Sequence, residues 1–211
     1  MLLVPLGSII SKWRFDRVFS FLATVYTSGI YGDINKVPTT GATCATAKQD
    51  KLKSCGVEAS KSLAQNDLGR INKYKSIILS VARQKQMDPS VIAGIMSRES
   101  RGGSILKNGW SAHNGGFGLM QIDEQYHKPI GAWDSETHIA QAVDILISTY
   151  NQIENKFRGQ SKENILKGAI AGYNTGAGNV RDINDVDRRT TGKDYANDVV
   201  GRAQFFKSKG Y

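Results

Sequence analysis

The feature that most constrains this chain is a helix pattern that places a carboxylate on the face expected to pack against a core. Asp88 and Pro89 predict the start of this helix, because an Asp side chain caps free backbone N–H groups and the φ angle of Pro suits the first helical position. Gly102 and Gly103 predict a left-handed turn at its end. Between them runs a stripe at helical spacing, made of Ile92, Ile95, Met96 and, one turn later, Glu99. We therefore expect Glu99 in the last helical turn, facing inward beside a glycine-rich loop.

This predicted position suits Glu99 to donate a proton. A carboxyl group among apolar side chains, at the negative end of a helix, is more stable in its neutral form, and its pKa is therefore raised. A carboxylic acid with a raised pKa is the usual general acid of an enzyme. From spacing alone, the alternative is a buried structural glutamate that pairs with an arginine or with backbone amides.

Length and charge narrow the class of protein but not its partner. The 211 residues, 40% hydrophobic and 22% charged, are typical of one globular domain with a sizeable core. The 28 Lys and Arg residues outnumber the 19 Asp and Glu residues, and the net charge of +9 favours a polyanion such as nucleic acid, an anionic membrane surface or an anionic cell wall. A basic surface kept for solubility is the alternative.

Motifs that would indicate other functions are missing from the sequence. It contains no pattern typical of a nucleic-acid-reading helix, a base-stacking sheet or a zinc module. It also contains no metal cluster, phosphate-binding loop, GxSxG motif or dinucleotide fingerprint. We therefore expect no metal, no cofactor and no nucleic-acid partner.

Residues 1–30 differ from the rest of the chain. Two apolar patches flank a charged stretch at residues 12–17, and neither patch is long enough to span a bilayer as a helix, so we expect no stable membrane insertion. The second patch, with basic residues before it and small residues at 27–29, fits a secretory signal and its cleavage site. Cleavage predicts a secreted, extracellular protein. A retained N-terminal extension is the alternative and would allow an intracellular one.

Residues 31–211 are predicted to form one α+β domain that is predominantly α-helical. Beyond the helix of Glu99, apolar periodicity predicts helices near residues 57–66, 71–86, 135–157, 166–173 and 193–207. Asp134 or Ser135 is the expected N-cap of the third of these. Residues 102–133 are rich in glycine and predict turns and short strands rather than a long helix.

A second helix end repeats the design found at Glu99. Tyr173 and Asn174 close a predicted helix immediately before the glycine turn at residues 176–178. The segment GFGLMQID at residues 116–123 lies between the two helix ends in sequence. Because functional sites are often built on loops held by a rigid scaffold, we expect these three segments to form the walls of one cleft.

Two cysteines occur, Cys44 and Cys55, with ten residues between them. This spacing matches neither a zinc site nor a CxxC redox motif. One disulfide across a short loop and two free thiols both remain open, because the choice depends on the cellular compartment.

Five segments together resemble the goose-type lysozymes of glycoside hydrolase family 23, whose wider relatives include the bacterial lytic transglycosylases. The resemblance covers residues 31–211 with compatible spacing. The segments are ESR at Glu99, NGW at residues 108–110, GFGLMQID at residues 116–123, GAIAGYNTGAGNV at residues 168–180, and YANDVVGRAQFFKSKGY at the C-terminus. The resemblance implies a lysozyme-like fold whose small glycine-rich β region flanks an active-site cleft.

The resemblance also implies an activity and a catalytic pair. The expected reaction is antibacterial hydrolysis of the β-1,4 bond between N-acetylmuramic acid and N-acetylglucosamine in bacterial peptidoglycan. Glu99 matches the catalytic acid of the family, and Asp123 matches one of two aspartates associated with the attacking water of an inverting reaction. Ala112 occupies the position of the second aspartate. A lytic transglycosylase, which needs no aspartate-held water, and a non-catalytic binder of peptidoglycan or chitin are the alternatives.

Further residues match substrate-contacting positions of the family, namely Gln121, His127, Tyr173, Asn174 and Tyr195. Each has a structural alternative, as a core side chain, a cap or a turn residue. Peptidoglycan is the expected substrate, chitin oligosaccharides are a second one, and we expect a monomer. The resemblance implies a Cys44–Cys55 disulfide, while Ile30 and Gln86 replace the two cysteines of a second bridge found in better-known relatives.

Overall fold

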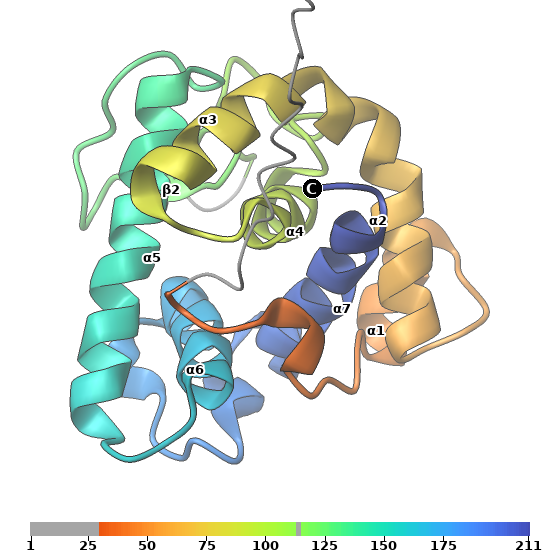
Figure 1. Ribbon diagram of the computed structural model, residues 1–211. Helices are drawn as coiled ribbons and strands as arrows, with labels where there is room; N and C mark the ends of the chain where they lie inside the picture. The colour runs from red at the N-terminus through yellow and green to blue at the C-terminus, as the bar shows by residue number, and fades with distance from the viewer. Residues whose placement is uncertain (1–29, 113–114) are drawn as a thin grey trace, which may run out of the picture.

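Residues 30–112 and 115–211 are described by the computed structural model of this chain (Figure 1). The segment 1–29, and with it the question of a signal or extension, lies outside the described residues. The α-helices are α1 (Cys44–Ala47), α2 (Val57–Ile71), α3 (Lys75–Lys85), α4 (Pro89–Ser100), α5 (Glu136–Lys156), α6 (Lys162–Thr175) and α7 (Tyr195–Ser208), and the strands are β1 (Gly116–Phe117) and β2 (Ile122–Asp123). The predicted α+β class with mostly helices is confirmed.

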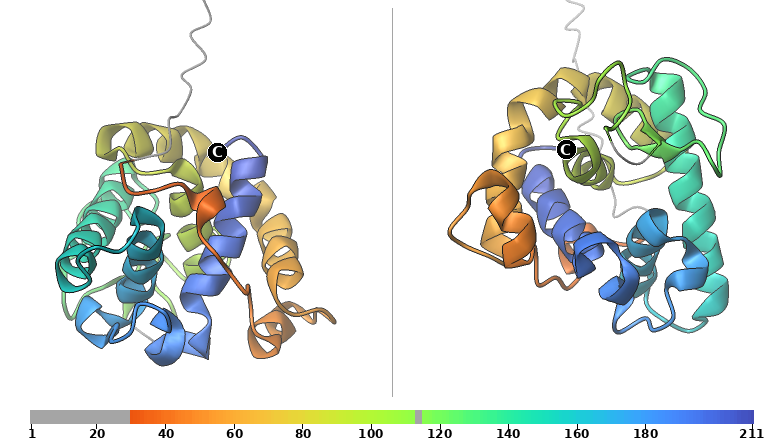
Figure 2. Two further views of the ribbon diagram at one scale, coloured as in Figure 1. Left: turned by 60° about the horizontal axis from the view of Figure 1, so that its bottom comes forward. Right: turned by 180° about the vertical axis from the view of Figure 1, so that it is seen from behind.

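Helix α4 lies at the centre of the molecule, with the other long helices around it (Figures 1 and 2). Its predicted start is confirmed, because the Asp88 carboxylate accepts a hydrogen bond of 3.0 Å from the backbone N–H of Ser90 and Pro89 follows as the first helical residue. Nearly all of α4 is buried, as expected of a helix that neighbours enclose on every side. Gly94 allows α7 to pack closely, since a Cβ there would lie 3.0 Å from the Val199 carbonyl oxygen.

The end of α4 differs in one residue from the prediction. Glu99 lies in the last turn as expected, but Arg101 is the first residue in the left-handed region, with φ of 55°. Gly102 and Gly103 continue the turn with φ of 64° and 86°. A non-glycine residue can hold this conformation when other contacts fix it, and here the side chain of Arg101 binds the Asp50 carboxylate.

Helix α2 extends beyond the predicted end near residue 66 and continues to Ile71, and a 3₁₀ turn at Asn72–Tyr74 then leads into α3. The extra turn places Ile71 in the core with no exposed surface, so the tertiary contact prolongs the helix. The prediction had assigned Ile71 to the start of the following helix, and that boundary was wrong.

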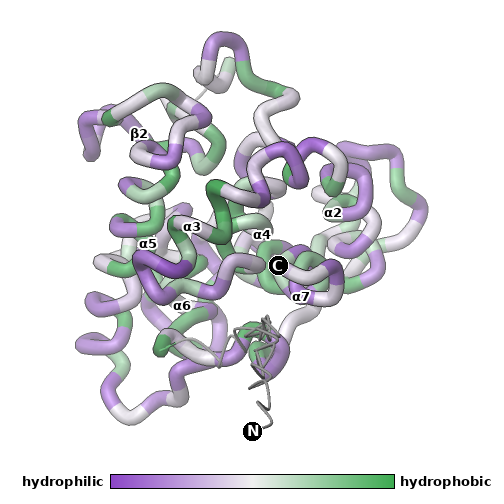
Figure 3. Tube along the Cα trace, turned by 45° about the horizontal axis from the view of Figure 1, so that its top comes forward, coloured by the Kyte–Doolittle hydropathy of each residue, from purple (hydrophilic) through white to green (hydrophobic). Residues whose placement is uncertain are grey.

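Helices α5 and α6 pack against each other at one side of α4 (Figure 2). Ser135 caps α5 and Ser161 caps α6, each accepting a hydrogen bond from a backbone N–H three residues later. Hydrophilic and hydrophobic residues alternate along α5 (Figure 3), which fits a helix with one face in the core and one in solvent. None of the described helices is long and apolar enough to cross a membrane.

The glycine-rich stretch contains turns and two short strands, as predicted, and the strands pair as an antiparallel hairpin. Gly116 pairs with Asp123 and Phe117 with Ile122. Gly118 begins the connecting turn with φ of +83°, and a side chain there would strike the ring of His138. The hairpin therefore depends on a glycine at this position.

The two cysteines form a disulfide, so this implication of the resemblance is confirmed. Cys44 and Cys55 are bonded, and their Cα atoms lie 4.8 Å apart. The bridge closes the segment that contains α1 and the following 3₁₀ turn, Lys48–Asp50. This closed segment, residues 44–55, is called the disulfide loop below.

Candidate functional site

Glu99 is neither fully buried nor fully exposed, and the pKa of its carboxyl group is shifted. The carboxyl oxygen Oε1 accepts a short hydrogen bond from the hydroxyl of Tyr195. Burial against its neighbours raises the pKa of Glu99 to about 7, while the Tyr195 hydrogen bond and the positive charge of Arg98 act in the opposite direction. A carboxylic acid of this kind holds its proton near neutral pH and can still transfer it.

Tyr195 is the first residue of α7 and is almost completely buried. Its burial, followed by the adjacent negative charge of Glu99, raises its pKa well above the ordinary value. The Tyr195 hydroxyl therefore stays protonated and donates to Glu99. In this structure, the hydrogen of the Tyr195 hydroxyl is donated to Glu99.

Tyr173 lies close to this pair near the end of α6. Burial and the charge of Glu99 raise its pKa well above the ordinary value, so its hydroxyl is a donor as well. It donates a hydrogen bond of 2.8 Å to the backbone carbonyl of Met120, which lies in the turn between β1 and β2. Tyr173 thus ties α6 to the hairpin.

The hairpin is also tied to α4. The hydroxyl of Ser100, the residue after Glu99, donates a 2.7 Å hydrogen bond to the Leu119 carbonyl. Consecutive carbonyls of one turn are therefore held by α4 and α6. This anchoring fixes the strand that ends in Asp123 relative to the helix that carries Glu99.

Asp123 is partly exposed at the end of β2. Its Oδ1 atom accepts a 2.9 Å hydrogen bond from the backbone N–H of Gln125, which is the turn role that the sequence left as the alternative. Ala112, the residue at the second aspartate position, is exposed. No carboxylate from this position can assist Asp123.

Three further predicted site residues, Gln121, His127 and Asn174, make hydrogen bonds within the fold. The amide of Gln121 donates to the Gly118 carbonyl at 2.6 Å, inside the turn. His127 is exposed, and its backbone N–H donates to the Asp123 carbonyl at 3.0 Å. The Asn174 Oδ1 atom accepts a 2.9 Å bond from the backbone N–H of Thr191 and so connects α6 to the segment before α7. The structure therefore gathers Glu99, Tyr173 and Tyr195. The substrate contacts expected of Tyr173, Tyr195 and the other residues remain predictions.

Sequence reasoning missed a buried ion network next to Glu99. Arg98 donates to Asp198 at 2.6 Å and to Asp194 at 3.0 Å, and all three side chains are at most 8% exposed. Arg202 joins the network through Asp198 and Asp67. One signal was available in the sequence, because Arg202 falls on the same predicted stripe as Val199, and a buried arginine requires carboxylate partners.

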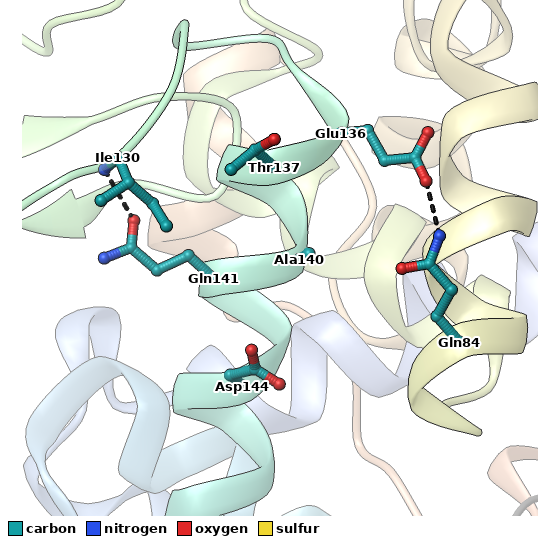
Figure 4. Close-up of a pocket in the computed structure, with 7 residues that line it drawn as sticks. All are labelled: Gln84, Ile130, Glu136, Thr137, Ala140, Gln141 and Asp144. Atoms are coloured by element: carbon teal, nitrogen blue, oxygen red, sulfur yellow. Dashed lines mark hydrogen bonds between the residues drawn. The ribbon is translucent and has the colours of Figure 1, made fainter.

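A hollow elsewhere on the molecule is lined by none of the predicted site residues. It has a volume of about 530 Å³ and lies between α3 and α5, and its lining residues are Gln84, Ile130, Glu136, Thr137, Ala140, Gln141 and Asp144 (Figure 4). Its carboxylates are already paired, since Glu136 accepts from Gln84 and Asp144 binds Lys85. Across residues 30–112 and 115–211, no group of His, Cys, Asp and Glu side chains is arranged to hold a metal ion.

Comparison with known proteins gives one consistent result. The sequence model described as "Lysozyme g" matches residues 31–210. The chain is 54% identical to lysozyme g of Cyprinus carpio, over 86% of this chain and 98% of that protein. It is 51% identical to lysozyme g of Struthio camelus, over 87% of this chain and 90% of that protein. It is 39% identical to human lysozyme g-like protein 2, over 87% of this chain and 82% of that protein.

Proposed function

Since this chain belongs to the lysozyme g family, we propose that Glu99 is the general acid with which it cleaves peptidoglycan. The chain is a glycoside hydrolase with lysozyme function, and its substrate is bacterial peptidoglycan. The observation that carries the assignment is the carboxyl of Glu99, whose burial raises its pKa to about 7, on a residue that is neither fully buried nor fully exposed. Defence against bacteria is the expected role of the reaction.

In the proposed reaction, Glu99 donates its proton to the oxygen of the β-1,4 glycosidic bond as that bond breaks. The sugar ring then carries the positive charge of an oxocarbenium-like transition state. Proton transfer leaves Glu99 ionised, and the Tyr195 hydroxyl and Arg98 both stabilise this anion. The same two groups that oppose the raised pKa thus support the carboxylate that forms during the step.

Asp123 is proposed to orient the water that attacks the opposite face of the sugar. Inverting glycosidases need a carboxylate across the substrate for this purpose. Asp123 fits the role because its strand is anchored to α4 through Ser100 and to α6 through Tyr173. With alanine at position 112, this single carboxylate has to hold the water.

The remaining predicted residues are proposed to bind the sugars, each with a part of the side chain that the fold leaves available. Tyr173 offers its ring, since its hydroxyl is engaged by Met120. Asn174 offers its amide nitrogen, since its oxygen is engaged by Thr191. Gln121 and His127 lie on the hairpin turn and on the exposed segment after Asp123.

Residues 31–211 are proposed as the catalytic domain, and residues 1–30 as a secretory signal. The apolar patch followed by small residues supports the signal, and peptidoglycan as substrate supports an extracellular location. Mass spectrometry of the mature N-terminus of the protein from its natural source tests the secretory signal. A mature chain that starts after residue 27 agrees with the proposal, whereas an intact Met1 contradicts it.

The activity is expected to fall as the pH rises through about 7. Glu99 donates a proton only in its neutral form, and its raised pKa of about 7 places the loss of that form in this range. The pH dependence of kcat/KM on solubilised peptidoglycan measures the midpoint of this alkaline limb. A kcat/KM that keeps its full value above pH 9 would contradict Glu99 as the acid.

The products test the proposed reaction directly. Mass spectrometry of fragments from purified peptidoglycan should show reducing ends, whereas anhydro-muramic ends would indicate a lytic transglycosylase. NMR of the first-formed fragments should show the α anomer, because inversion of a β bond gives an α product. The β anomer would contradict the inverting mechanism.

Asp123→Asn is expected to lower kcat by about 10²-fold with little change in KM, because the amide cannot take the proton of the attacking water. The turn should persist, since the Asn oxygen can still accept from Gln125. Kinetics on solubilised peptidoglycan measure the effect. Asp182→Asn is a matched control, because Asp182 also accepts a backbone N–H two residues later, from Asn184, in an exposed turn. Equal kcat values for the two variants would exclude Asp123 as the base.

A further inference from the structure

Two pairs of contacts run side by side between α4 and the start of α7. Glu99 contacts Tyr195, and the residues immediately before them in sequence, Arg98 and Asp194, form an ion pair of 3.0 Å. The Arg98 guanidinium also lies 5.6 Å from the centre of the Tyr195 ring. Arg98 therefore contacts both Asp194 and the ring of the tyrosine that donates to the acid.

The position of Arg98 is overdetermined. Its two terminal nitrogens donate to Asp198 at 2.6 Å, to Asp194 at 3.0 Å and to the Thr191 carbonyl at 3.2 Å. A planar guanidinium satisfies such divergent acceptors at once, which an ammonium group cannot do. This geometry is specific to arginine, and the cost of burying its charge is offset only while all of these partners remain in place.

Asp194 is held in turn from the far side. Its Oδ2 atom accepts from the backbone N–H of Thr43 at 2.6 Å and from the Thr43 hydroxyl at 2.8 Å. Thr43 directly precedes Cys44, so the disulfide loop anchors this contact. Gly192 leaves room for the arrangement, because a Cβ there would lie 2.7 Å from Asp194 Oδ1 and 3.3 Å from a nitrogen of Arg98.

We propose that the Arg98–Asp194 ion pair, braced by Thr43, is a positioning element that holds the Tyr195 hydroxyl against the carboxyl of Glu99. This inference rests on the proposed role of Glu99 as the general acid. In this proposal, Arg98 and Asp194 act through Tyr195 rather than on the substrate. The pair therefore controls how readily Glu99 releases its proton.

The titratable groups around Glu99 give the sign of the expected effect. Tyr195 of α7 and Arg98 of α4 lower its pKa, and Tyr173 of α6 faces it as a protonated hydroxyl. The β1–β2 turn, whose carbonyls accept from Ser100 and Tyr173, is followed by Asp123, the first carboxylate after it in sequence. If the Tyr195 hydrogen bond weakens while the charge of Arg98 is retained, the pKa of Glu99 rises. The alkaline limb of activity then moves to higher pH.

Arg98→Lys tests the proposal, because it keeps the positive charge and removes the planar guanidinium whose two terminal nitrogens bind Asp198, Asp194 and Thr191. We expect kcat to fall about 10-fold and the alkaline limb to move up by about 0.5–1 pH unit. Arg202→Lys is the matched control, since the Arg202 side chain is 4% exposed against 8% for Arg98 and binds the same Asp198, while the ring contact with Tyr195 belongs to Arg98. It should lower the melting temperature to a similar extent and leave the limb unmoved. Tyr195→Phe removes the hydrogen bond to Glu99 outright and should give the largest upward shift of the alkaline limb.

The outcomes separate this inference from the proposed function. If the alkaline limb of activity has the same midpoint pH in Arg98→Lys and Arg202→Lys, the positioning role is overturned while Glu99 remains the acid. Full activity in Glu99→Gln would instead overturn the proposed function. If Arg98→Lys does not fold, Thr43→Val replaces it, because it removes one hydrogen bond to Asp194 without changing charge. The Thr43→Val limb should move upward, and the limb of Thr43→Ser, which keeps the hydroxyl, should stay in place.

Discussion

Glu99→Gln is expected to lower the rate of peptidoglycan hydrolysis by about 10³-fold or more while the protein stays folded. A glutamine amide has nearly the shape of the carboxyl and can still accept the hydrogen bond from Tyr195, but it cannot deliver a proton to the leaving oxygen. General acid catalysis contributes about 10²–10⁴-fold. Release of soluble fragments from purified cell walls measures the loss.

A matched variant makes this result specific to Glu99. Glu154→Gln changes an exposed carboxylate on α5 and should keep the parent rate. Circular dichroism and thermal unfolding of both variants should match the parent protein, because neither change removes a core contact. A Glu99→Gln protein that hydrolyses within a few-fold of the parent would exclude Glu99 as the acid, and the catalytic group would have to lie elsewhere.

Gly118→Ala is expected to destabilise the protein by about 2–5 kcal/mol and to abolish most of its activity. The residue adopts φ of +83°, which costs an alanine about 1–2 kcal/mol. The new Cβ would also lie 1.9 Å from the Nε2 atom of His138, and overpacking of this kind costs about 1–3 kcal/mol. His138 cannot easily withdraw, because its ring nitrogens lie 3.0 and 3.1 Å from the carbonyl oxygens of Phe117 and Ile130.

Chemical denaturation of Gly118→Ala and of a control variant measures the two contributions separately. Gly159→Ala has the same backbone problem, with φ of +86°, but a Cβ there meets no atom within 4 Å. It should therefore cost about 1–2 kcal/mol and leave the activity unchanged. Equal free energies of unfolding for the two variants would show that the contact with His138 does not constrain the hairpin.

Local sequence signals were sufficient for the secondary structure near the site. Capping by Asp88 and Ser135 and the apolar stripes located α4 and α5 to within about a residue. The boundary at Ile71 was misplaced because a core contact, rather than a local signal, extends α2. The left-handed Arg101 was not predicted, and its side chain binds Asp50 in the disulfide loop, 51 residues earlier in sequence.

The chemistry of the site was only partly visible in the sequence. The periodicity placed Glu99 at an inward-facing helix end, and the family resemblance added Tyr195 to the site. The direct bond between the two residues required the fold, because it joins positions 96 residues apart. Arg98 and Asp194 were missed for a related reason. A charged side chain usually faces solvent, and the packing of α4 against the start of α7 buries both Arg98 and Asp194.

The 96-residue separation between Glu99 and Tyr195 also has a consequence for biosynthesis. Ribosomes make the chain from the N-terminus, so α4 is complete long before α7 emerges. Until α7 docks, Glu99 has no tyrosine partner and Arg98 has neither Asp194 nor Asp198. Closing so long a loop is a late and slow event. A nascent chain therefore carries Glu99 without the hydrogen bond and the ion pairs that tune its acidity, and the last helix to be synthesised completes the surroundings of the acid.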